Sequence, residues 1–144
     1  MLSKTAAPGK GLLKITGILK VPVGIFVVLF TALTVSFPII STYDVLVSCA
    51  LIILGLLMIV SGVFGVMKCA VLDKAAGLKR LAIIEILITL VVALLVVIFE
   101  GNVYDLWYVI LGFMVLWVPA FILAILYLIG ALRNKRAYEG SQAS

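Results

Sequence analysis

The stretch VLVSCALIILGLLMIVSGVFGVM, residues 45–67, has no charged side chain and decides the fold. At a rise of 1.5 Å per residue, a helix of about 20 residues crosses the ~30 Å hydrocarbon core of a bilayer. A membrane-spanning strand would need only about ten residues with alternating apolar and polar side chains, and this stretch does not alternate. It therefore predicts a transmembrane helix.

Three further apolar runs of similar length cover residues 21–40, 81–99 and 106–132. Of the 144 residues, 66% are hydrophobic, and this share exceeds the roughly half-apolar composition of soluble domains. Only 12% are charged. The sequence predicts an all-α polytopic membrane protein, a single domain of four transmembrane helices with short loops. Residues 1–20 would form a cytoplasmic or interfacial N-terminal segment, and residues 133–144 a cytoplasmic tail.

The basic residues give the orientation, because all eleven precede the first run, separate the second from the third, or follow the fourth. They are Lys4, Lys10, Lys14, Lys20, Lys68, Lys74, Lys79, Arg80, Arg133, Lys135 and Arg136. The other two connections carry the acids Asp44, Glu100 and Asp105 instead. Lysine and arginine concentrate in cytoplasmic loops, so both termini are predicted to be cytoplasmic. The net charge of +5 then reflects topology beside a lipid bilayer and indicates no nucleic-acid partner.

The segment GKGLLKITGILKVP, residues 9–22, has two interpretations. Its mixture of leucine, isoleucine and lysine suits a short interfacial helix whose lysines extend to the headgroups, but it equally suits the inner turns of the first span. Proline inside a helix leaves one carbonyl without its amide donor. We therefore expect a bend at Pro22 and a kink at Pro119, in the middle of the fourth run.

Residues that carry catalysis or bind metals are scarce. The chain has no histidine, no pair of carboxylates at catalytic spacing and no glycine-rich phosphate loop, which predicts no enzyme, no cofactor and no metal site. Cys49 and Cys69 lie at opposite ends of the second span, roughly 30 Å apart by helical rise, and cannot pair within one chain. Cys69 is a candidate site for reversible palmitoylation, but a free cysteine that acts as a small apolar residue is the favoured interpretation.

Small residues line one face of the second span. Ser48, Gly55, Gly62 and Cys69 recur every seven positions, and Ser61 and Gly65 form a further small pair four residues apart. Small side chains let helix backbones approach closely where lipid supplies no hydrophobic drive. Ser48, Gly55, Ser61, Gly62 and Gly65 are therefore predicted helix-packing residues. The first span of the same chain is the favoured partner, and another subunit is the alternative.

The segment SGVFGVMKCAVLDKAAGLKRLAIIEILITL, residues 61–90, resembles one part of the tetraspanins. Gly62, Gly65 and Lys68 are followed by a short cytoplasmic turn and a span that carries an acid, as in the second-to-third-span region of that family. The resemblance covers about a fifth of the chain, and the family's large extracellular loop has no counterpart here. It implies a tetraspan bundle that organises other membrane proteins laterally.

Glu85 is the one acid inside the third run. It lies about five residues beyond Arg80, hence roughly 7 Å inside the cytoplasmic edge, and no second buried charge is expected near it. Burial in lipid favours the neutral acid, whereas Lys79, Arg80 or a lysine of the N-terminal segment would keep it ionised. A structural ion pair or interhelical hydrogen bond is favoured over a role in transport.

These observations predict a non-catalytic tetraspan protein that serves as a scaffold, an accessory subunit or a self-assembling structural component. Its partners would be other membrane proteins or copies of itself, and the plasma membrane is the preferred location. The alternative is a small oligomeric channel or transporter that uses Glu85 as an intramembrane cation or proton site.

Overall fold

The computed structural model describes residues 7–35, 42–100 and 117–142, which are mainly helical. The long helices are α1 (Lys10–Val35), α2 (Thr42–Lys68), α3 (Ala75–Glu100) and α5 (Val118–Gln142), and a 3-10 turn, η1 (Leu72–Lys74), precedes α3. An apolar chain in lipid must satisfy its backbone hydrogen bonds internally, which helices do. The protein is all-α, as the sequence predicts.

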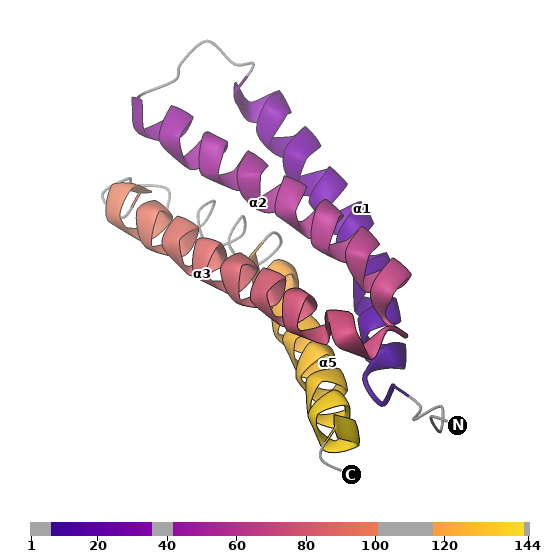
Figure 1. Cartoon of the computed structure of the whole chain (residues 1–144). Coiled ribbons are helices and arrows are strands. Elements are labelled where there is room, and N and C mark those ends of the chain that lie inside the picture. Colours follow the sequence, from indigo (N-terminus) through magenta and orange to yellow (C-terminus); the bar gives the residue numbers. More distant parts are fainter. Residues whose placement is uncertain (1–6, 36–41, 101–116, 143–144) are drawn as a thin grey trace.

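The four long helices of the described residues form an antiparallel ring (Figure 1). Helix α1 makes its most extensive contact with α2, α2 packs on α3, α3 on α5, and α5 returns to α1. Helices α1 and α3 therefore occupy opposite corners. The start of α1, the α2–α3 connection and the end of α5 lie together at one end of the bundle, which we call the terminal end.

The α2–α3 connection is tight because the chain leaves the helical conformation for only a few residues. Val71 is extended, with φ −101° and ψ 101°, and its amide donates to the carbonyl oxygen of Lys68 at 3.0 Å. The amide of Lys74 then donates to the Val71 carbonyl at 3.3 Å, which starts η1. The turn returns the chain antiparallel to α2.

Helix α1 begins eleven residues before the predicted first span and runs without interruption through Pro22. Residues 9–22 are thus the inner turns of the first long helix, the second of the two interpretations. Pro119 is the second residue of α5, and residues 101–116 before it lie outside the described part of the chain, so the kink expected at Pro119 stays a prediction. Helix α5 also continues ten residues past the predicted end of the fourth run.

Within the described residues, three helices are long and apolar enough to cross a membrane: α1 over Lys10–Leu33, α2 over Val45–Lys68, and α5 over Val118–Gln142. Helix α3 is not among them, and its first turns carry Lys79, Arg80 and Glu85. A span by α3 stays a prediction. The predicted outer connections at residues 36–41 and 101–116, and the start of the fourth run, lie outside the described residues.

Two buried apolar clusters fill the ring. The cluster near the terminal end consists of Leu13, Cys69, Leu78, Ala82, Tyr127 and Ala131. The second, farther from that end, consists of Leu54, Met58, Ala120 and Leu123, with Val23 and Ile88 against it. Polar side chains are buried between these clusters, and they form the candidate site.

Candidate functional site: a buried ion pair and its surroundings

Glu85 of α3 forms an ion pair with Lys20 of α1 in the centre of the bundle. The Lys20 Nζ and Glu85 Oε2 atoms are 2.6 Å apart, and the two side chains are 0% and 1% exposed. An ionised group removed from water is stable only when it is paired and hydrogen-bonded. The pair joins opposite corners of the ring, because α1 and α3 are not among the helix pairs in extensive direct contact.

Ser61 and Tyr127 complete the centre from the other two helices. The Ser61 hydroxyl of α2 lies 2.9 Å from Glu85 Oε2, to which it donates, and accepts a hydrogen bond from Lys20 Nζ at 3.3 Å. The Tyr127 hydroxyl of α5 donates to the Ser61 carbonyl oxygen at 2.9 Å. The Lys20 ammonium lies 3.9 Å from the centre of the Tyr127 ring, in a cation–π contact. Each of the four long helices thus contributes one side chain.

The centre is closed, and one of its atoms lacks a partner. None of the four side chains is more than 2% exposed. Glu85 Oε1 is buried without a hydrogen-bond donor among the described residues, whereas Oε2 receives both bonds. The Thr89 hydroxyl, one turn along α3, donates to the Glu85 backbone carbonyl oxygen at 2.6 Å and therefore does not donate to Oε1. The positive charge of Lys20 and the negative charge of Glu85 balance each other.

Asn134 makes a second interhelical contact, at the terminal end. Its Oδ1 atom accepts a hydrogen bond from the Gly9 amide at 2.7 Å, and its Nδ2 atom donates to the Cys69 carbonyl oxygen at 2.9 Å. The side chain is 0% exposed. One amide side chain therefore connects the segment before α1, the end of α2 and α5.

Backbone-to-backbone contact between α1 and α2 depends on two pairs of glycines. A Cβ atom added to Gly62 would lie 2.7 Å from the Gly17 carbonyl oxygen, and one added to Gly17 would lie 2.7 Å from the Gly62 carbonyl oxygen. Gly24 and Gly55 stand in the same reciprocal relation, at 2.6 and 2.9 Å. Any larger residue would force the helices apart. Both pairs lie within one chain, so the partner of this α2 face is α1.

The other predicted packing residues of α2 have different neighbours. Gly65 faces α5, where an added Cβ would overlap the Tyr127 ring. Ser61 lies in the charged centre, and Ser48 is half-buried. Cys69 is 5% exposed and its thiol lies 3.2 Å from the Val66 carbonyl oxygen, a buried position that favours the small apolar interpretation over palmitoylation. Cys49 is exposed.

The structure corrects one expectation and adds several residues to the site. The expectation of no second buried charge is wrong, because Lys20, counted with the basic rim, lies ten residues inside α1 and is fully buried. Glu85 is bonded to this N-terminal lysine, and no contact joins it to Lys79 or Arg80 among the described residues. Sequence reasoning did not find Tyr127, Asn134, Gly17 or Gly24. The seven-residue spacing of Gly17 and Gly24, equal to that of Gly55 and Gly62, is the signal that was available.

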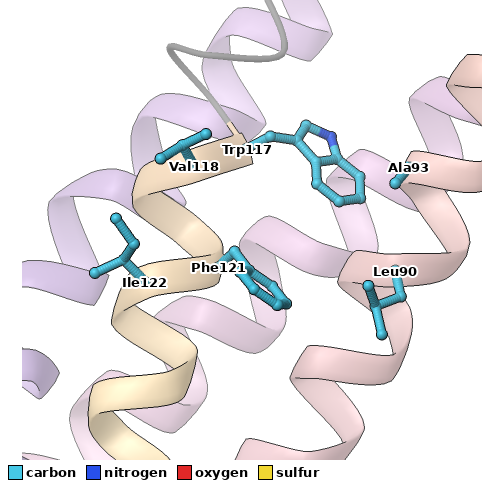
Figure 2. A pocket seen from close by; sticks show the side chains of 6 residues that line it. All are labelled: Leu90, Ala93, Trp117, Val118, Phe121 and Ile122. Carbon is cyan, nitrogen blue, oxygen red and sulfur yellow. The ribbon is translucent and has the colours of Figure 1, made fainter.

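An apolar pocket of about 280 Å³ lies between α3 and α5, away from the charged centre (Figure 2). Leu90 and Ala93 line it from α3, Trp117 lines it from just before α5, and Val118, Phe121 and Ile122 line it from the first turns of α5. None of these side chains is ionisable. No group of three or more histidine, cysteine, aspartate or glutamate side chains that could hold a metal ion occurs in the described ranges.

Comparison of the chain with protein-family models, with curated proteins and with solved structures found no match. The resemblance of residues 61–90 to the tetraspanins therefore stays a prediction. The candidate site rests on its geometry alone.

Proposed function

We propose that the protein is a non-catalytic, four-span membrane protein that acts as a scaffold or accessory subunit through its helix surfaces. The observation that carries the proposal is the closed Lys20–Glu85 pair, whose charges are satisfied by each other and by Ser61. A group that moves ions or substrate needs access to them, and these side chains have almost no exposed surface. Their role is to fix the four helices relative to one another.

The outer surface supports the same role. Large apolar side chains are exposed along all four long helices, including Ile18, Phe26, Leu33, Ile53, Leu56, Leu87, Leu94 and Ile122. In a bilayer such faces contact lipid tails or the helices of other membrane proteins. A bundle held together by its own polar centre keeps these faces available for a neighbour. In this proposal α3 also crosses the membrane, in addition to α1, α2 and α5. Both termini are cytoplasmic, because the basic residues gather at the terminal end.

A small channel or transporter is the second candidate, and one observation favours it. Glu85 Oε1 is buried and has no hydrogen-bond donor in the described part of the chain, and such a carboxylate oxygen is suited to hold a proton or a cation. The protein would then need an opening to the centre and further polar lining. The scaffold proposal requires neither.

A flux assay in liposomes distinguishes the two candidates. Purified wild type and a Lys20→Met/Glu85→Leu double variant, which removes both charges together, are reconstituted with a proton or potassium gradient. We expect both to match protein-free liposomes. Flux through the wild type that the double variant loses would overturn the scaffold proposal.

Photocrosslinking in native membranes tests the positive claim. A photoreactive residue at the exposed Leu56 or Phe26 should capture a defined membrane protein or a second copy of the chain. The same residue at Met58, which is 0% exposed, is the matched control and should crosslink only within the chain. Capture of lipid alone from the exposed positions would count against a scaffold.

A further inference from the structure

The terminal end of the bundle carries seven basic side chains without an ion-pair partner among the described residues. We call this set the basic collar. Its members are Lys10, Lys14, Lys68, Lys79, Arg80, Arg133 and Arg136. All seven are exposed or half-buried. Each of the four long helices contributes at least one of them.

Tertiary structure gathers the collar at one end. The Asn134 side chain bonds Gly9, just before Lys10, and Cys69, just after Lys68, and itself follows Arg133. Leu13, beside Lys14, packs so close to Gly130 that a Cβ added there would lie 2.9 Å from the Leu13 side chain. The tight turn through η1 brings the first turns of α3, with Lys79 and Arg80, to the same end (Figure 1).

The acids near the collar do not neutralise it. Asp73 lies 3.5 Å from its neighbour Lys74, and Glu139 lies 3.0 Å from Lys135, one turn away on α5. Glu85, the remaining described acid of this region, is bound to Lys20 inside the bundle. The described acids therefore leave the positive charge of the collar available to a ligand.

We propose that the basic collar binds the phosphate groups of anionic lipid headgroups. The collar side chains lie where the apolar outer faces of the helices end. On α1, for example, the exposed apolar face begins directly after Lys14, with Ile15 and Leu19. At such a boundary the aliphatic stems of lysine and arginine lie along the helix while their charged ends reach the headgroup phosphates. Lipid phosphate is present there at high local concentration, and it suits the arginine guanidinium groups on α3 and α5.

The inference requires helices that cross a bilayer, but it does not depend on the scaffold role. Failure of the flux or crosslinking experiment would leave it intact. An acidic protein segment or free phosphate would meet the same charges, and the test below distinguishes them from lipid.

Native mass spectrometry of the purified protein from mixed micelles, with equal amounts of phosphatidylglycerol and phosphatidylcholine, tests the proposal. We expect the wild type to retain phosphatidylglycerol in preference. An Arg133→Gln/Arg136→Gln variant should lose about twenty-five-fold in apparent affinity, because each of the two cations near an anionic surface contributes about fivefold. The matched control, Lys74→Gln/Lys135→Gln, removes the same charge from side chains that already have acidic partners, and it should lose much less.

Three results would overturn the proposal. The first is equal retention of the two lipids by the wild type. The second is an equal loss in both variants, since that would show a response to net charge and no site at the collar. The third is displacement of phosphatidylglycerol by excess inorganic phosphate or by an acidic peptide, which would indicate a soluble ligand. Unchanged thermal unfolding of both variants ensures that the comparison is made on folded protein.

Discussion

The α1–α2 contact and the α3–α5 contact differ in how closely the backbones approach. Two reciprocal glycine pairs bring α1 and α2 to backbone distance, whereas α3 and α5 are separated by bulky side chains that leave a pocket of about 280 Å³ (Figure 2). Lipid tails are as apolar as leucine, so association within a bilayer depends on close packing and on interhelical hydrogen bonds. The first helix pair relies on close backbone packing. The second pair is held to the first by polar contacts in addition to side-chain packing.

The polar contacts lie between the two helix pairs. Lys20 of α1 reaches Glu85 of α3, Tyr127 of α5 reaches Ser61 of α2, and Asn134 of α5 reaches the segment before α1 and the end of α2. The comparison implies that a bulky residue at the glycines separates α1 from α2, while loss of a polar group separates the α1–α2 pair from the α3–α5 pair. The predictions below test this division of roles.

Apart from the Lys20–Glu85 pair itself, the largest effect is expected at Gly62. A leucine there must push α1 away from the Gly17 carbonyl, and overpacking of this kind costs about 1–3 kcal/mol, with backbone contacts at the upper end. The free energy of unfolding in mixed micelles measures the loss. Gly77→Leu is the matched control, because an added Cβ at Gly77 meets nothing within 4 Å. Equal losses in the two variants would show that the α1–α2 contact does not depend on glycine.

Asn134→Leu should have the next largest effect. It leaves the Gly9 amide and the Cys69 carbonyl without their partner, at an expected cost of about 1.5 kcal/mol. Hydrogen exchange at the start of α1 should increase more than exchange in the middle of α2. A uniform increase across the chain would contradict a local role for Asn134.

Tyr127→Phe should have a smaller effect, because it removes the bond to the Ser61 carbonyl but keeps the ring beside Lys20. Single hydrogen bonds between membrane helices contribute about 0.5–1 kcal/mol. Tyr138→Phe is a suitable control, since the Tyr138 hydroxyl accepts a hydrogen bond from the exposed Gln142 side chain at the surface. A loss at Tyr138 as large as that at Tyr127 would show that the buried bond has no special weight.

Ala93→Leu should have the smallest effect. The added carbons enter the pocket between α3 and α5, and since lipid already provides apolar surroundings, the gain is limited to dispersion contacts of less than about 0.5 kcal/mol. The free energy of unfolding in mixed micelles should be unchanged or slightly larger than that of the wild type. A large loss of stability would mean that the α3–α5 contact is as tight as that of α1 and α2.

Much of the architecture is present in the sequence, because long apolar runs and the positions of lysine and arginine follow from the bilayer alone. The helical class and Glu85 as the unusual residue were both found this way. The partner of Glu85 was harder to identify. Lys20 directly precedes an apolar run, so the sequence predicts that it lies at the basic edge of the membrane. Because α1 begins at Lys10, Lys20 lies well inside the helix instead.

Residues that depend on facing direction could not be found from the sequence. Tyr127 lies in an apolar run, where the sequence does not distinguish an aromatic ring that faces lipid from one that faces the centre. The apolar residues of α5 are distributed almost evenly around the helix axis, so they do not indicate its inner face. Asn134 lies between basic residues past the predicted end of the fourth run, where polar side chains are ordinary. Only tertiary packing shows that both point inward.

The central claim is that Lys20 and Glu85 form one closed structural unit, and a double-mutant cycle on unfolding free energy tests it most directly. Lys20→Met or Glu85→Leu alone leaves a buried charge without its partner and should cost about 3–5 kcal/mol. The Lys20→Met/Glu85→Leu double variant should be close to the wild type in stability, because no unpaired charge remains. A double variant that loses the sum of the two single losses would contradict the account.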